Sequence, residues 1–181
     1  MILHRFRACI RALPMALALA AGSAAADVQQ EIQALARQGN YAAALQKLDQ
    51  AESADPKNAA LMFQRGVLLA ESGRKDEALA QYERVIEQFP ELPEPYNNLA
   101  ALAAARGQYE RARWALESAL RADPNFALAQ ENLGDLYLRM AALAYEKAQQ
   151  LAPERQALQK KLQQVRSLDV ALPPPTTAPK N

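Results

Sequence analysis

The residues best suited to acid–base chemistry are two pairs of carboxylates, Asp76 with Glu77 and Glu91 with Glu94. Two neighbouring carboxyl groups can act as general acid and general base when their surroundings keep one of them protonated. Each pair lies where a helix is expected to begin, and acidic side chains are stabilised there by the helix dipole. We therefore interpret both pairs as solvated helix starts rather than as a catalytic centre.

Nucleophilic and metal chemistry is limited by where the single histidine and the single cysteine lie. His4 and Cys9 both fall within residues 1–26. If this segment is removed, the remaining chain has no thiolate, no imidazole base and no histidine for a metal site. The serines considered as nucleophiles then have no activating base: Ser53, Ser72 and Ser118. We predict no catalytic residue, no metal site and no cofactor.

Residues 1–26 have the pattern of a secretory signal peptide. The basic start MILHRFRACIR is followed by the apolar run ALPMALALAA and then by three alanines at positions 24–26. An apolar run this short falls well below the roughly 20 residues that span a bilayer, so we expect no stable membrane anchor. We expect cleavage before Asp27 after export by the general secretory pathway, and a periplasmic protein.

Removal of this segment also changes the charge of the chain. Lys plus Arg falls from 21 to 18, because Arg5, Arg7 and Arg11 are lost, while Asp plus Glu stays at 20, so the formal net charge is 18 minus 20, or −2. A slightly acidic chain gives no indication of a nucleic-acid partner. The length that remains suits a single domain.

The elements that must position any functional side chains recur at a 34-residue step. Glycines repeat at this step, and each is followed half a repeat later by a proline: Gly39, Gly73 and Gly107, then Pro56, Pro90 and Pro124. Core-type residues between them keep the same register: Ala44, Ala78 and Ala112, then Leu48, Tyr82 and Leu116. Glycine ends helices in a left-handed conformation and proline cannot continue them. The pattern predicts one helix before each glycine and another between glycine and proline.

The fullest copy, PYNNLAALAAARGQYERARWALESALRADP at residues 95–124, resembles the tetratricopeptide repeat, a helix-turn-helix unit with the same 34-residue period. The resemblance implies an all-α fold, a tetratricopeptide-type repeat array that forms a right-handed superhelical solenoid. We expect this domain at residues 27–168, with repeats at about 27–58, 59–92 and 93–126, a truncated fourth repeat at 127–153 and a capping helix at 154–168. The proline-rich residues 169–181 predict a disordered tail.

The fourth repeat lacks five residues. Pro153 arrives five residues earlier than the 34-residue step predicts, and the missing segment is the counterpart of residues 107–111, which hold the turn. The sequence across the join, YLRMAALAYEK, contains good helix formers and no helix breaker. We favour one fused helix from near Ala127 to near Leu151, about 37 Å long. A tight turn within residues 139–142 is the alternative.

A fused helix cannot fold back on itself and would leave an apolar stripe exposed. We expect either the amphipathic residues 154–168 or a second subunit to cover this stripe. In the second case the chain would be a self-associating structural protein, a homodimer formed through the fused helix. Binding to a membrane surface is an alternative role for the amphipathic segment.

In the resembled family, the first helix of each repeat lines a concave groove that binds other proteins. By this analogy the partner-binding residues are Phe63, Val67, Ala70, Asn97, Asn98, Ala101, Glu131, Asn132, Asp135 and Arg139. Such a mixed apolar and amide surface suits an extended or helical protein segment, with Phe63 as its anchor. Asn98 recurs one repeat later as Asn132, which indicates either hydrogen bonds to a bound peptide or packing within the repeats. Trp114, on a second helix, is expected to pack between helices.

The sequence therefore predicts a non-catalytic scaffold or adaptor that binds a protein or peptide partner. The resemblance implies an envelope process, such as cell-envelope assembly, peptidoglycan remodelling or secretion, and it does not choose among them. Nothing in the sequence identifies the partner.

Overall fold

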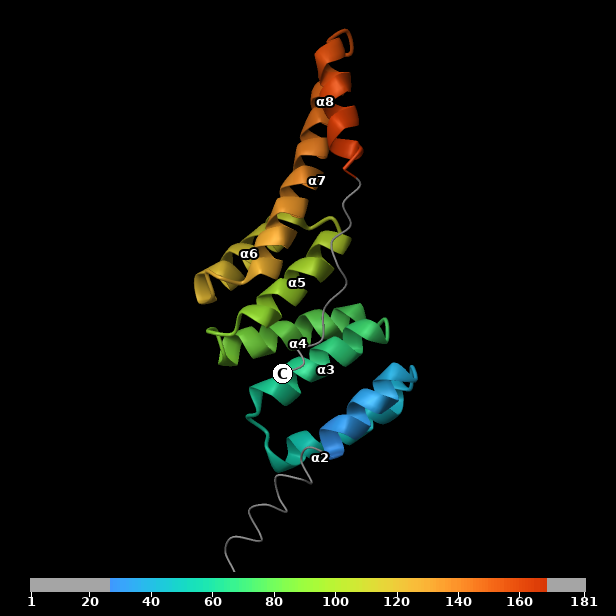
Figure 1. Cartoon of the computed structure of the whole chain (residues 1–181), viewed down its shortest axis with the longest axis vertical. Coiled ribbons are helices and arrows are strands. Elements are labelled where there is room, and N and C mark those ends of the chain that lie inside the picture. Colours follow the sequence, from blue (N-terminus) through green and yellow to red (C-terminus); the bar gives the residue numbers. More distant parts are fainter. Residues whose placement is uncertain (1–26, 169–181) are drawn as a thin grey trace, which may run out of the picture.

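The computed structural model describes residues 27–168, which are helical with short connections and contain no strand. A helical stretch at residues 27–37 is followed by α2 (Tyr41–Ala54), α3 (Ala59–Glu71), α4 (Lys75–Gln88), α5 (Pro93–Ala105), α6 (Tyr109–Ala122), α7 (Ala127–Leu151) and α8 (Gln156–Arg166). Figure 1 shows these helices stacked along the long axis of the molecule, with α7 and α8 projecting from one end. The predicted all-α repeat array is confirmed. The predicted signal peptide and proline-rich tail lie outside the described residues.

Glycine ends the first helix of each of the first three repeats, as the spacing predicts. Gly39, Gly73 and Gly107 have φ angles of 73°, 82° and 74°, in the left-handed region where a side chain is unfavourable. After α5, the Gly107 N–H donates to Ala104 O and the Gln108 N–H donates to Ala103 O, each at 3.0 Å. These bonds satisfy carbonyls at the helix end and reverse the chain into α6.

The first helices of repeats two and three begin at residues whose types favour a helix start. The Asn58 side chain accepts hydrogen bonds from the backbone N–H groups of Ala60 and Leu61 at 3.1 and 3.2 Å, which caps α3. Pro93 is the first residue of α5, where its missing N–H costs nothing. Local sequence therefore fixes where each helix pair starts.

The core lies between the two helices of each repeat and between neighbouring repeats. Positions that recur at the repeat step are fully buried in the second helices of repeats two and three: Ala78, Tyr82 and Val85, then Ala112, Leu116 and Ala119. In repeat two the Tyr82 ring packs against Gly66, where an added Cβ would lie 2.4 Å from Tyr82 Cε1. A glycine is therefore required on α3 for the paired helices to approach this closely.

The fourth repeat is a single helix. Helix α7 runs through the join without interruption, which confirms the predicted fused helix, and the alternative of a tight turn within residues 139–142 is wrong. Helix α8 packs along its second half, burying Leu158 and Leu162, and Arg166 Nη2 lies 2.5 Å from Glu146 Oε1. The predicted covering helix is thus present, although it covers only one side of α7. No described helix is long and apolar enough to cross a membrane.

Candidate functional site

The residues predicted to bind a partner lie on α3, α5 and α7, but most of them are buried in the chain itself. Six are buried: Phe63, Val67, Asn97, Asn98, Ala101 and Asn132. Ala70, Asp135 and Arg139 are half-buried, and Glu131 is exposed. The accessible part of the predicted surface is therefore concentrated on α7.

Phe63, the predicted anchor, is a member of the hydrophobic core. Its side chain is 6% exposed, and its ring centroid lies 5.9 Å from that of Tyr82. Its neighbour one turn away, Val67, is 2% exposed. Aromatic pairs at this separation stabilise a fold beyond the area that they bury. The described chain thus gives Phe63 a packing role, and little of its ring is left for a partner to contact.

The asparagines form a buried chain of hydrogen bonds that links repeats two to four. Asn98 Nδ2 donates to the Tyr82 hydroxyl oxygen at 3.3 Å, and Asn97 Nδ2 donates to Asn98 Oδ1 at 3.4 Å. Asn132 Nδ2 donates to Asn97 Oδ1 at 2.7 Å, which joins α7 to α5. Buried amides need such partners, because an unpaired polar group in the core is costly. Of the two interpretations of Asn98 and Asn132, packing within the repeats is the one that the described contacts favour.

Tyr82 contributes a hydroxyl to this chain of bonds, and its environment keeps the hydroxyl neutral. Burial raises the pKa of Tyr82 well above its ordinary range, and the hydrogen bond with Asn98 lowers it only in part. A neutral phenol can accept from the Asn98 amide at every pH near neutrality. The link between α4 and α5 is therefore insensitive to pH in this range.

Three charged residues of α7 remain at the surface of the predicted site. Glu131, Asp135 and Arg139 are spaced by four residues, so they lie along one side of the helix. We call them the concave row. The neighbouring Asn132 and Leu136 are buried on the side that packs on the array. The row is thus carried by a helix whose rotation is fixed by its core contacts.

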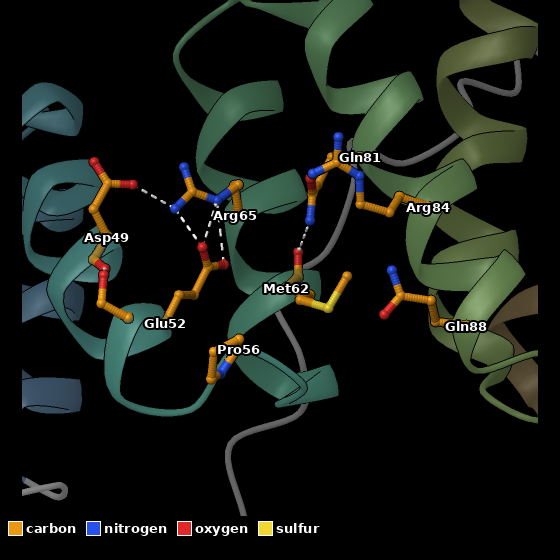
Figure 2. A pocket seen from close by; sticks show the side chains of 9 residues that line it. Asp49, Glu52, Pro56, Met62, Arg65, Gln81, Arg84 and Gln88 are labelled. Atoms are coloured by element: carbon orange, nitrogen blue, oxygen red, sulfur yellow. Dashed lines mark hydrogen bonds and ion pairs between the residues drawn. The ribbon is translucent and has the colours of Figure 1, made fainter.

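An open cleft on α2, α3 and α4 was not anticipated from the sequence. Its volume is about 440 Å³, and Figure 2 shows the side chains that line it: Asp49, Glu52, Ser53, Pro56, Met62, Arg65, Gln81, Arg84 and Gln88. Asp49 and Glu52 give one side of the cleft carboxylates, and Arg84 and Gln88 lie on the other side of Met62. The cleft is polar, and its two sides carry opposite charge.

Arg65 holds the acidic side of the cleft together. Its Nε donates to both carboxylate oxygens of Glu52, at 3.2 and 3.0 Å, and its Nη2 lies 2.5 Å from Asp49 Oδ1. The hydrogen bonds to Glu52, followed by those to Asp49, raise the pKa of Arg65. A signal existed in the sequence, since Arg65 occupies the position of the apolar Leu99 one repeat later.

The first carboxylate pair considered for acid–base chemistry forms salt bridges at the surface. Asp76 Oδ1 lies 2.7 Å from Arg106 Nη1, and Glu77 Oε2 lies 2.6 Å from Arg74 Nη2, both at the surface. Hydrogen bonding to Arg74 lowers the pKa of Glu77, so this carboxylate is not poised to act as an acid. Within residues 27–168, no group of three or more candidate ligands could hold a metal ion.

Trp114 is more exposed than predicted. Its ring meets Tyr96 edge to face, with the centroids 6.1 Å apart, but half of the side chain (50%) remains exposed. The expectation that it packs between helices is therefore only partly correct. Trp114 stands on the outer side of α6, where none of the described helices covers it fully.

Comparisons with known proteins support the protein class and the type of repeat. The described chain is a helical repeat protein, and a family model described as a tetratricopeptide repeat matches residues 30–93, while a second model with this description matches residues 81–113. The units over residues 30–113 are thus supported as tetratricopeptide repeats. Arrays of this kind present extended binding surfaces, and they are generally protein-interaction scaffolds without catalytic activity.

Individual relatives agree with this assignment over part of the chain. A TPR repeat-containing thioredoxin, TTL4 of Arabidopsis thaliana, is 41% identical over 75 residues, which are 41% of this chain and 11% of the relative. The chain thus spans about a tenth of the length of that protein. The crystal structure of YrrB, described as a TPR protein with an unusual peptide-binding site, is 29% identical, with a TM-score of 0.50 over 55% of this chain and 52% of YrrB.

A broader structural match shows the fold alone. MamA from Desulfovibrio magneticus RS-1 has a TM-score of 0.56 and covers 80% of this chain and 85% of its own, at 22% identity. The stacking of helices described above is therefore a known arrangement across most of the chain.

Proposed function

We propose that this chain is a non-catalytic adaptor that holds a segment of another protein against the concave row and the adjoining surface of α3 and α5. The observation that carries the proposal is the contrast within the predicted site. Asn97, Asn98 and Asn132 are buried and hydrogen-bonded to one another, whereas on the same helix as Asn132 the charged Glu131 is exposed and Asp135 and Arg139 are half-buried. A binding surface on rigid elements costs little ordering on association.

The charges of the row indicate the chemistry of the partner segment. Glu131 and Asp135 favour a segment with basic side chains, and Arg139, one turn beyond Asp135, favours a carboxylate or amide at the segment's other end. Ala70 on α3, which is half-buried, adds a small apolar contact. An extended or helical peptide of mixed charge satisfies these conditions. The peptide-binding site for which YrrB is described supports a peptide as ligand.

The site of action that we propose is the bacterial periplasm. The basic and apolar segments of residues 1–26 support export, with the adaptor beginning near Asp27. In that compartment the partner would belong to cell-envelope assembly, peptidoglycan remodelling or secretion. N-terminal sequencing of the protein recovered from the periplasm tests this part, and a protein that retains residues 1–26 in the cytoplasm would contradict it.

Crosslinking from single positions tests the binding surface. A photoreactive side chain in place of Asp135 should yield a crosslinked partner in cells, and Glu131→Lys in the same chain should diminish that product. The matched control places the probe at Glu87, which is exposed on α4. Crosslinks of equal yield from Glu87, or a product that is unaffected by Glu131→Lys, would exclude the concave row.

A further inference from the structure

The fourth repeat retains the side chains of a closed helix pair, although its two halves cannot meet within one chain. Gly134 is the counterpart of Gly66, two repeat steps earlier, and Tyr145 is the counterpart of Tyr82 once the five missing residues are allowed for. In repeat two this glycine and this tyrosine are in contact. In repeat four they lie on one helix, separated by three turns or about 16 Å. The matched pair is present, but it is separated.

The glycine half of the pair is open. An added Cβ at Gly134 would meet nothing within 4 Å, whereas at Gly66 it would lie 2.4 Å from the ring of Tyr82. Tyr137, one turn further along α7, is 48% exposed, while its counterparts Leu69 and Ala103 are 6% and 0% exposed. The missing second helix therefore leaves uncovered the surface that it covers in repeats two and three.

The tyrosine half of the pair is also incompletely covered. In the second half of α7, three residues are half-buried: Ala141, Tyr145 and Ala148. Their counterparts in α4 and α6 are fully buried. Ala144 is exposed, although its counterpart Ala115 is fully buried. Helix α8 lies on the adjacent side, where Lys161 Nζ is 5.6 Å from the centre of the Tyr145 ring.

These exposed and half-buried residues form one stripe along α7. Gly134, Tyr137, Ala141, Tyr145 and Ala148 follow one another at steps of three and four residues, which places them on a single face of the helix. We call them the stripe. The midpoint between Gly134 and Tyr145 falls between residues 139 and 140. A two-fold axis at this point would place the glycine of one helix opposite the tyrosine of an antiparallel copy.

We propose that two copies of this chain pair through the stripe, with α7 helices antiparallel, so that each Tyr145 packs on Gly134 of the other copy. Each copy then supplies the second helix that the other lacks. Such an interface is isologous and closes on itself, as expected for a two-fold dimer. Short connections invite the exchange of elements between chains, and here the connection is absent, so the fourth repeat cannot close within one chain. The proposal does not depend on binding at the concave row, which lies on another side of α7.

The oligomeric state of the purified chain is the first test. Sedimentation velocity across a range of concentrations should show a dimer, and Gly134→Leu should raise its dissociation constant on the order of tenfold or more, because the added side chain occupies the place of the tyrosine. The variant should melt no lower than the native chain when both are monomeric, since this position is open in the single chain. Gln150→Leu, exposed on the opposite side of α7, is the matched control and should stay dimeric.

A crosslink between the two positions tests the register. In a Cys9→Ser background, Gly134→Cys with Tyr145→Cys should form a disulfide-linked dimer on oxidation. A disulfide needs Cα atoms within about 7 Å, so the two cysteines of one helix cannot react with each other. Gly134→Cys alone should remain uncrosslinked, because the two copies of that position are far apart in the antiparallel pair.

Restoration of the turn should abolish the pairing. Insertion of Gly-Gln-Tyr-Glu-Arg between Met140 and Ala141 lets the second half fold back, so Tyr145 can reach Gly134 of its own chain, and the product should be a monomer. A native chain that is monomeric at every concentration would overturn the proposal. So would a dimer that persists unchanged in Gly134→Leu or in the insertion variant.

Discussion

Repeats three and four are built from similar residues but expose very different surfaces. In repeat three, Gly107 turns the chain, and α6 returns along α5 to bury Ala100, Ala103 and Leu116 almost completely. In repeat four the five turn residues are absent, and the corresponding Gly134 and Tyr137 are exposed. The difference teaches that core-type side chains are buried only where the connection allows the helices to meet. Residue type alone does not decide whether a side chain is buried.

The largest difference in stability is expected between a variant of Phe63 and a variant of the concave row. Phe63→Glu places a carboxylate in the core and removes an aromatic contact, which should cost about 3 to 5 kcal/mol or more. Glu131→Lys changes an exposed residue and should shift stability by no more than about 0.5 kcal/mol. Thermal unfolding followed by circular dichroism measures both. A folded Phe63→Glu chain with native melting would show that this side chain is accessible after all, and would restore it as an anchor.

The next contrast compares equivalent positions of the second helices. Leu116 is fully buried in α6, and Leu116→Ala should destabilise by about 2 to 5 kcal/mol. Tyr145, its counterpart, is half-buried, so Tyr145→Ala should cost about 1 kcal/mol in the single chain, mainly from the lost contact with Lys161. Urea denaturation at dilute protein concentration compares them. Equal losses would mean that the second half of α7 is packed as tightly as α6.

A third contrast uses the two equivalent glycines. Gly66→Ala forces a methyl group against the Tyr82 ring and should destabilise by about 1 to 3 kcal/mol. Gly134→Ala adds a better helix former at an open position and should stabilise the single chain by up to about 1 kcal/mol. The two changes in melting temperature should therefore have opposite signs. The same sign for both would contradict the open surface at Gly134.

The smallest contrast concerns buried and accessible polar groups. Asn98→Ala removes the partner of the buried Tyr82 hydroxyl and should cost about 1 to 2 kcal/mol. Asp135→Ala should leave unfolding almost unchanged, because its carboxylate is partly in solvent. Chemical denaturation measures the stability of both variants, and partner capture measures their binding. Native stability of Asn98→Ala would favour a role at the surface instead of in the core.

Features set by local sequence were predicted correctly. The turns at Gly73 and Gly107 follow from a conformation that other residues avoid, and the continuous α7 follows from the absence of any residue that stops a helix. Both depend on nearest neighbours along the chain. That is why the repeat boundaries and the fused helix could be derived without knowledge of the tertiary packing.

Side-chain surroundings were harder to predict, because they depend on contacts between distant residues. Every residue of α5 from Pro95 to Ala104 is buried, so the spacing of residues along this helix could not show that Asn97 and Asn98 face neighbouring helices and not a groove. Arg65 finds Glu52, 13 residues away, only because α2 and α3 lie side by side. Trp114 occupies a position of the second helix that is also exposed in the earlier repeats, at Ala80 and Gln46. The buried amides and the polar cleft could not be placed without these contacts.

The packing of α7 on the array also has a mechanical consequence. Leu136 is the last buried residue of α7, and Leu151 at the end of that helix is about 22 Å further along its axis. A tilt of roughly 10° of this outer part would move its tip by about 4 Å. A small change in the direction of α7 where it leaves the array would thus become a displacement about the size of a side chain at its far end.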